Sequence, residues 1–182
     1  MVDTDPLPPA RSTDGYRIAV VCLGNICRSP MADVVLGARV ADAGLGDRIR
    51  VESFGTGDWH VGGPMDHRAA ATLTAEGYDA SRHRARQVTR GDLDGVDLVL
   101  AMDHANEADL RNLGVDPGRL RMFRAFDAEA TAGHDDEVPD PYYGGDDGFT
   151  EVLTMVERTS DRLVDALAAR LGADHPGEPG PA

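Results

Sequence analysis

The chain alternates between continuous apolar runs and amphipathic stretches, and this alternation predicts its secondary structure. Apolar runs at Tyr16–Cys22 and Asp97–Met102 are typical of strands that are buried on both faces. Arg50–Phe54 and Leu120–Phe123 are predicted to be two shorter strands. Between and after these runs the pattern predicts helices at 30–43, 66–76, 103–113 and 148–171, with a long acidic loop at 131–147.

Strands that alternate with helices are typical of one fold class. We therefore expect a single α/β domain with a central four-stranded parallel sheet and helices on both of its faces. Residues 1–15 and 172–182 are rich in proline, glycine and acidic residues and lack periodicity. The sequence therefore predicts a domain at 16–171 between two flexible tails.

The segment that follows the first predicted strand carries the candidate chemistry. A strand, a tight loop and a helix N-terminus together present backbone N–H groups to an anion, which predicts a phosphate-binding loop. A cysteine held there is expected to be ionised and nucleophilic, and an arginine six positions later can clamp two anion oxygens. The eight residues are Cys22, Leu23, Gly24, Asn25, Ile26, Cys27, Arg28 and Ser29, of which Gly24 and Asn25 tolerate positive φ.

Composition narrows the class of function. The net charge is −14 and no basic stripe is present, which argues against nucleic acid as a partner. No apolar run approaches the roughly 20 residues that span a bilayer, and the N-terminus resembles no secretory signal. Both cysteines lie inside the loop and the histidines are not clustered, so we expect a cytoplasmic protein that binds no metal and needs no cofactor.

The loop in its strand and helix context resembles that of the low-molecular-weight protein tyrosine phosphatases, and matches run from about Tyr16 to Leu171. The resemblance implies a protein-tyrosine-phosphatase, a hydrolase in which Cys22 attacks phosphorus and Arg28 binds the oxygens. The acidic loop holds six carboxylates between residues 135 and 147, and spacing alone does not choose among them. The segment Asp140-Pro141-Tyr142-Tyr143-Gly144 resembles the family's D-P-Y-Y segment, which makes Asp140 the expected general acid and base.

The same resemblance implies roles for residues around the loop. Ser53 and His83 are expected to join Asn25 in a hydrogen-bond network that supports the loop, while Ser29 donates to Cys22. An aromatic pocket for the substrate ring is expected from Trp59, Tyr142 and Tyr143. Matches also include Pro64-x-Asp66-x-Arg68 and Met102-Asp103-x-x-Asn106, whereas Phe54 stands where the family usually has a small residue. We assign no role to His60, His67, His104, His134 or His175.

Three other activities remain as alternatives on the same residues. A thioredoxin-linked arsenate reductase would need two more cysteines, and a protein-arginine phosphatase carries threonine where this chain has Ile26. An inactive phosphotyrosine-binding module would not need nucleophile, clamp and acid together. The expected partners are phosphotyrosine proteins, with a tyrosine kinase as a further candidate and phosphate-like oxyanions as inhibitors of a monomeric enzyme. Cys27 is the expected redox partner of Cys22.

Overall fold

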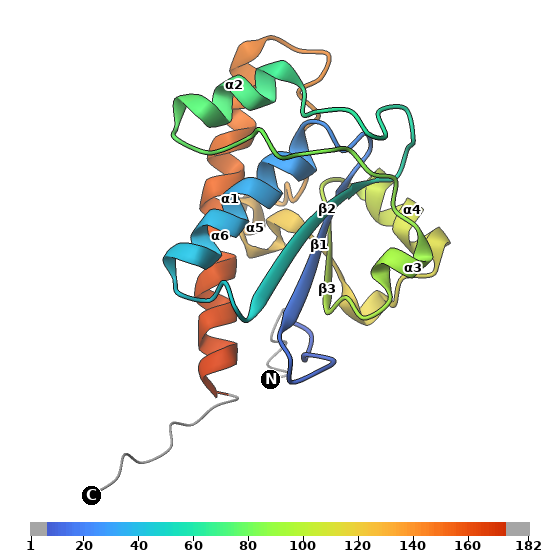
Figure 1. The fold of residues 1–182 in the computed structure, drawn as a ribbon, viewed down its shortest axis with the longest axis vertical. Helices are drawn as coiled ribbons and strands as arrows, with labels where there is room; N and C mark the ends of the chain where they lie inside the picture. The colour runs from blue at the N-terminus through green and yellow to red at the C-terminus, as the bar shows by residue number, and fades with distance from the viewer. Residues whose placement is uncertain (1–6, 174–182) are drawn as a thin grey trace, which may run out of the picture.

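The four segments predicted to be strands form one parallel sheet in a computed structural model that describes residues 7–173 (Figure 1). The strands are β1 (Tyr16–Cys22), β2 (Ile49–Gly55), β3 (Leu98–Ala101) and β4 (Leu120–Met122). Their order is β2-β1-β3-β4, with β1 paired in parallel to both β2 and β3. The predicted fold class is therefore confirmed.

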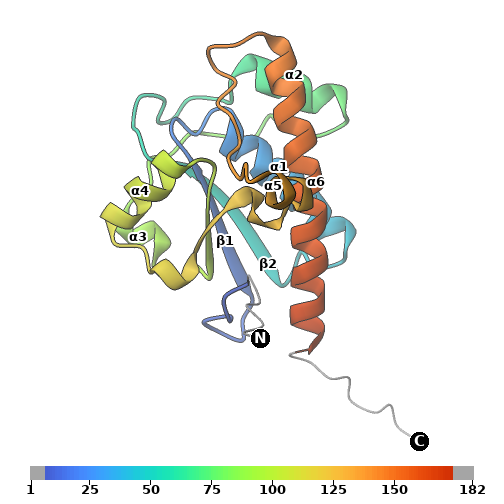
Figure 2. The same ribbon diagram turned by 180° about the vertical axis from the view of Figure 1, so that it is seen from behind.

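Helices cover both faces of the sheet, as Figures 1 and 2 show from opposite sides. One face carries α1 (Arg28–Asp42) and the long α6 (Asp146–Ala173), against which α2 (His67–Ala75) packs. The other face carries α3 (Arg90–Leu93) and α4 (His104–Leu113), and α5 (Ala128–Gly133) precedes the loop that leads to α6.

The side chains of β1 divide the core into two layers. Ile18 and Val20 point into the larger cluster beneath α1 and α6, while Ala19 and Val21 join the smaller cluster beneath α4. All four are at most 1% exposed, as expected for a strand buried on both faces. These buried residues fix the position of β1, and Cys22 at its end begins the predicted phosphate-binding loop.

Short helical segments were not predicted from the sequence. The four-residue α3 is closed by a capping box between Thr89 and Asp92, and α5 occupies the start of the segment expected to be a loop. Two 3₁₀ turns, Pro117–Arg119 and Phe123–Phe126, flank β4. Such segments are too short to show an apolar period, so local capping rather than periodicity marks them.

Residues 7–15 differ from the flexible tail that we expected. Leu7 is 2% exposed and belongs to the core beneath α6. The Tyr16 hydroxyl donates to the carbonyl of Pro8 at 2.9 Å, and Arg119 donates to the carbonyl of Pro9 at 2.9 Å. Arg170, near the end of α6, donates to the carbonyl of Leu7 at 3.2 Å. Residues 1–6 and 174–182 of the expected tails lie outside the described residues.

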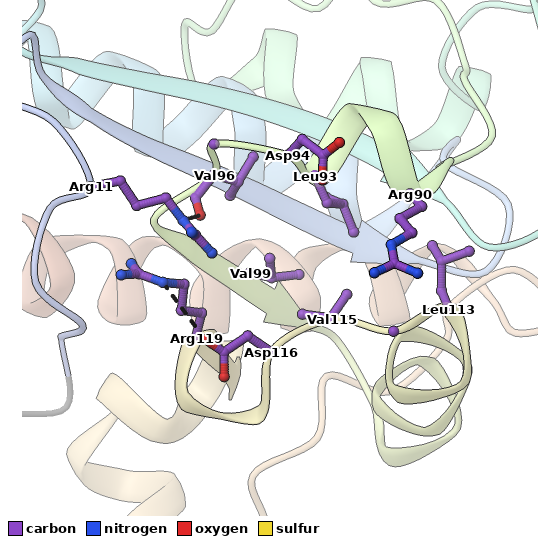
Figure 3. Close-up of a pocket in the computed structure, with 12 residues that line it drawn as sticks. Arg11, Arg90, Leu93, Asp94, Val96, Val99, Leu113, Val115, Asp116 and Arg119 are labelled. Atoms are coloured by element: carbon purple, nitrogen blue, oxygen red, sulfur yellow. Dashed lines mark hydrogen bonds and ion pairs between the residues drawn. The ribbon is translucent and has the colours of Figure 1, made fainter.

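The N-terminal segment also builds a pocket at the edge of the sheet where the strands begin. Figure 3 shows Arg11 and Arg119 at one end of this pocket, Arg90 at the other and Val99 between them. The Arg11 side chain is held by the Val96 carbonyl at 3.0 Å. The pocket measures about 210 Å³, and it lies at the opposite edge of the sheet from Cys22, which ends β1.

Asp127, the N-cap residue of α5, is a buried carboxylate that binds Arg124 and also Arg158 of α6. It is fully buried and accepts hydrogen bonds from Arg124 Nε at 3.2 Å and from Arg158 Nε and Nη2 at 2.7 Å each. Burial opposes its ionisation, but the bonds from Arg158, Glu129 and Arg124 outweigh burial and lower its pKa from 3.8 to about 2. That shift corresponds to about 2.5 kcal/mol of stability at neutral pH.

We expect Asp127→Asn to lower the free energy of unfolding at pH 7 by about 3 kcal/mol, because two arginines would lose their buried partner. The folded pKa lies below the unfolded pKa, so this stabilisation is present above about pH 4 and disappears as the pH falls towards 2. Urea unfolding between pH 7 and 2.5 should show the difference between wild type and variant shrinking. A difference that does not change with pH would contradict this assignment, and the exposed Asp109→Asn serves as the control.

Candidate active site

The phosphate-binding loop runs from Cys22 at the end of β1 to the first turn of α1 at Arg28. Asn25 has φ 55, the left-handed conformation that lets the loop close on itself. Its amide nitrogen donates to Ser29 Oγ at 2.9 Å, and its Oδ1 accepts from the Arg86 backbone N–H at 2.8 Å. Asn25 therefore supports the loop from inside, and strain at this residue is balanced by its bonds.

His83 and Ser53 approach the loop from behind, but they do so through different partners. His83 Nε2 lies 2.6 Å from the Asn25 carbonyl oxygen. Burial lowers the pKa of His83, so the neutral ring donates this bond through Nε2–H. Ser53 donates to Asp33 of α1, and no bond joins Ser53 to Asn25 among residues 7–173. Burial raises the pKa of Asp33 to about 6 against the opposing effect of that bond.

The end of β2 presses closely on the loop. Thr56 N–H donates to the Cys22 carbonyl and Gly57 N–H to the Leu23 carbonyl, each at 2.9 Å. A Cβ on Gly55 would stand 2.8 Å from the Leu23 oxygen, so only glycine fits at this position. Phe54 is accommodated on the other side of the sheet, where the Arg86 guanidinium lies 4.4 Å above its ring.

Cys22 lines the pocket, and within residues 7–173 its sulfur has one side-chain hydrogen-bond partner. Its Sγ lies 3.0 Å from Ser29 Oγ, which also accepts from Asn25 and lies 3.2 Å from the Phe54 carbonyl. A hydroxyl has one proton, so Ser29 can give it either to Phe54 or to Cys22. A Cys22 thiolate would draw that proton, which stabilises the ionised sulfur.

Arg28 is buried beside the cysteine with its guanidinium held by acidic and carbonyl oxygens. Its side chain is 3% exposed, and Nη1 donates to Asp103 Oδ2 at 2.6 Å and to the Val138 carbonyl at 3.1 Å. Nη2 lies 3.4 Å from Asp140 Oδ2. Burial disfavours the charged form, but Cys22, Asp103 and Asp140 outweigh it and raise the pKa of Arg28. Asp103 also caps α4, and it holds Arg28 in position, a role that its place at the start of a predicted helix did not indicate.

Asp140 stands above the loop with one oxygen towards Arg28. Its side chain is 37% exposed, and Oδ1 accepts from the Tyr142 backbone N–H at 3.1 Å. The preceding loop is fixed because Val138 N–H donates to the Met102 carbonyl at 2.7 Å. The carboxylate lines the same pocket as Cys22 and can reach both protein and solvent.

These groups open into a pocket of about 520 Å³. Trp59, Tyr142 and Tyr143 form its rim and are 70%, 37% and 93% exposed. His60 also lines the pocket, although we assigned it no role, and its ring centroid lies 6.4 Å from that of Tyr142. The sequence signal that could have indicated this role is its position next to Trp59, which we expected to line the pocket. The lining residues are Cys22, Leu23, Gly24, Ile26, Cys27, Arg28, Trp59, His60, Asp140, Tyr142 and Tyr143.

Comparisons with known proteins identify the family of this chain. A family model described as low molecular weight phosphotyrosine protein phosphatase matches residues 17–173. A low molecular weight protein-tyrosine-phosphatase of Streptomyces coelicolor is 48% identical over 84% of this chain and 93% of its own length. Low molecular weight protein-tyrosine phosphatase A of Mycobacterium tuberculosis is 43% identical over 90% and 99%.

Solved structures show the same fold. YfkJ from Bacillus subtilis superposes with a TM-score of 0.79 at 31% identity, covering 88% of this chain and 98% of its own. A protein tyrosine phosphatase from Entamoeba histolytica with Hepes in its active site also has a TM-score of 0.79, at 30% identity over 85% and 98%. A cysteine-containing anion loop on a four-stranded parallel sheet thus defines the class as a phosphatase. The chain belongs to the low-molecular-weight phosphotyrosine protein phosphatase family.

Proposed function

We propose that this chain hydrolyses phosphotyrosine in proteins through a cysteinyl-phosphate intermediate. The observation that carries the proposal is the convergence of Cys22, Arg28 and Asp140 on one pocket. Nucleophile, anion clamp and general acid are the groups that a phosphate monoester needs when no metal takes part. An inactive binding module would need only the clamp.

The proposed reaction has two chemical steps. In the first, the Cys22 sulfur attacks phosphorus and the bond to the tyrosine oxygen breaks, while Asp140 gives that oxygen its proton. In the second, the Asp140 carboxylate takes a proton from water as the water oxygen attacks phosphorus. The P–S bond then breaks, and inorganic phosphate and the Cys22 thiolate are released. Arg28 and the N–H groups of the loop stabilise the equatorial oxygens in both steps.

The rim supports an aromatic substrate. A cluster of exposed aromatic side chains is typical of a binding groove, and here Trp59, Tyr142 and His60 line the pocket together with the anion loop. A phenyl ring between them would place its phosphate at Cys22. Ile26 lines the pocket with an apolar side chain, which favours an aryl ester over phosphoarginine.

Turnover of p-nitrophenyl phosphate, a phosphotyrosine peptide and the matching phosphoarginine peptide, with chelator present, tests the proposal. We expect release of phosphate from the first two and much slower release from the third. Phosphate-like oxyanions should inhibit competitively because they fill the same loop. Faster hydrolysis of phosphoarginine would reassign the substrate, and no turnover of any of the three would leave only a binding role.

Asp140→Asn should reduce kcat most for substrates with poor leaving groups. Phenolate needs a proton to leave, whereas p-nitrophenolate is stable without one, so we expect a loss of about 10²–10³-fold for phenyl phosphate and a smaller loss for p-nitrophenyl phosphate. Steady-state kcat for the two esters measures this split. The exposed neighbours Asp146→Asn and Asp147→Asn are the controls. The same split in either of them, and not in Asp140→Asn, would move the acid to that residue.

Peroxide should inactivate the enzyme reversibly through Cys22 and Cys27, which line the same pocket. Burial, followed by the charges of Asp66, Cys22 and Asp140, raises the pKa of Cys27, so Cys27 stays a thiol while Cys22 is oxidised to a sulfenic acid. The Cys27 sulfur then attacks the sulfenic sulfur of Cys22, and as the disulfide forms the thiol proton leaves with the sulfenic hydroxyl as water. In Cys27→Ser, recovery with dithiothreitol should be largely lost. Mass spectrometry that finds no linked loop peptide in oxidised wild type would make Cys27 a packing residue.

The remaining features of the proposed function concern its setting. In the part of the chain that the structure describes, no helix is long and apolar enough to cross a membrane. We propose a monomer that acts in the cytoplasm, where reducing conditions keep both thiols free, on substrates made by a tyrosine kinase. Size-exclusion chromatography with light scattering tests the monomer.

A further inference from the structure

Arg68 lies where three segments of the chain meet, just outside the pocket. It stands in the first turn of α2, its side chain is 24% exposed, and it is absent from the residues that line the pocket. Its guanidinium contacts Asp66, the Tyr142 carbonyl and the ring of Phe149. The motif Pro64-x-Asp66-x-Arg68 thus reaches the general-acid segment, and the mechanism above gives it no function.

On one side, Arg68 is fixed to the phosphate-binding loop through Asp66. Arg68 Nε and Nη2 donate to the two carboxylate oxygens of Asp66 at 3.1 and 3.0 Å, a two-pronged pair. Asp66 also caps α2 by accepting the Arg68 backbone N–H at 2.9 Å. The Asp66 N–H donates to the Ile26 carbonyl at 2.9 Å, so the pair has a fixed position relative to the loop.

On the other side, Arg68 holds the segment that carries Asp140. Its Nη2 donates to the Tyr142 carbonyl at 3.0 Å, and its guanidinium lies 4.7 Å from the ring centroid of Phe149, a fully buried residue of the first turn of α6. The Tyr142 N–H in turn donates to Asp140 Oδ1 at 3.1 Å. Two hydrogen bonds, both to the backbone of Tyr142, therefore connect the Arg68 guanidinium to the carboxylate of Asp140.

Arg28 also contacts this segment, but Arg28 cannot hold it during the reaction. The guanidinium that reaches Asp140 at 3.4 Å and the Val138 carbonyl at 3.1 Å is the group that must clamp the phosphate oxygens. Arg68 does not face the pocket, so its bond to Tyr142 does not compete with substrate. A fixed general acid needs such an anchor, because small displacements of a catalytic group cost large factors in rate.

We propose that Arg68 is a positioning residue that couples the general-acid segment Asp140–Tyr142 to the phosphate-binding loop. It keeps the Asp140 carboxyl at the leaving oxygen while Arg28 is engaged by phosphate. The inference rests on the proposed function, in which Asp140 protonates the leaving group. Its signature is a loss of kcat that depends on the leaving group, with little change in KM.

The test compares Arg68→Met, which keeps the apolar stem, with Arg68→Lys, which keeps the charge but cannot make the two-pronged pair and reach Tyr142 together. We expect Arg68→Met to lower kcat for phenyl phosphate about tenfold and kcat for p-nitrophenyl phosphate less than about threefold. Arg68→Lys should show the same split at smaller size. Arg111→Met, which breaks an exposed pair with Glu107 on α4, is the matched control and should change neither ester.

A double-mutant cycle with Asp140→Asn separates positioning from a general structural effect. With Asp140 replaced there is no acid left to place, so adding Arg68→Met should lower kcat less than about twofold. Additive losses, an equal loss on both esters, or a change confined to KM would overturn the inference. Melting temperatures accompany every variant, and if Arg68→Met does not fold, Arg68→Lys decides by the same criteria.

The inference and the proposed function fail in different ways. If wild type hydrolyses both esters and Asp140→Asn shows the leaving-group split, but the Arg68 variants do not, only the role of Arg68 is wrong. If Asp140→Asn itself shows no split, the general acid is misassigned and the role of Arg68 is overturned with it.

Discussion

Cys22→Ser should lose phosphatase turnover, by about 10⁵-fold or more, and keep its fold. The substitution changes one buried atom, since Cys22 is 2% exposed at the end of a strand that stays fully paired. Serine can still accept the bond from Ser29, but its hydroxyl ionises far less readily than a thiol, and no described group lies placed to remove its proton. The nucleophile is therefore lost, whereas the anion cradle remains.

The cradle gives this experiment a second readout. Trp59 is the only tryptophan of the chain and lines the pocket, so its fluorescence should report a bound oxyanion in both wild type and Cys22→Ser. Two measurements are needed: the rate of p-nitrophenyl phosphate hydrolysis, and the binding of tungstate followed by the fluorescence of Trp59. Substantial turnover by Cys22→Ser would remove the covalent mechanism, and lost oxyanion binding together with a lower melting temperature would mean that the loop had collapsed.

Arg28→Lys should lower kcat by about 10²-fold or more, although it preserves the charge. The guanidinium of Arg28 spans Asp103, the Val138 carbonyl and Asp140 from a nearly inaccessible position. A single ammonium cannot keep the bond to Asp103 and also present two parallel N–H groups to phosphate. The loss should fall on kcat because equatorial oxygens are bound best in the transition state.

Arg50→Lys, on an exposed arginine paired with Glu52, is the control for this substitution and should leave kcat unchanged. Asp103→Asn provides an intermediate case, since it keeps the cap of α4 and weakens only the support of Arg28. A loss of less than about threefold in Arg28→Lys would show that charge alone suffices and that the two-pronged clamp is not needed.

The elements with their own chemical signal were predicted from the sequence. The bounds of β1 followed from an apolar run that only Arg17 interrupts, and those of α4 from Asp103 before it and Gly114 after it, which takes φ 94 at the helix end. The eight-residue loop was located because its residue types and its place after a strand agree. Features that depend on residues far away in the sequence were not predicted, because the local pattern of apolar and polar residues contains no information about them.

Three residues illustrate that limit. Leu7 sits in a proline-rich stretch with no period, yet it is buried because α6 and Arg170 lie beside it. Asp103 was expected only at the start of the helix at 103–113, and the fold brings its second carboxylate oxygen to Arg28. His60 received no role from the sequence, and only the structure places it in the lining of the pocket beside Trp59. Each depends on contacts across more than 30 residues.

The contact between Leu7 and Arg170 also orders events during synthesis on the ribosome. These residues are 163 positions apart, and Leu7 and α6 complete the same core layer that lies under β1 and α1. The nucleophile loop is made well before the helix that covers its supporting layer. Until α6 emerges, the apolar face of α1 and β1 stays exposed to water, to chaperones and to other nascent chains. Catalytic competence therefore requires that α6 has left the ribosome and packed on this layer.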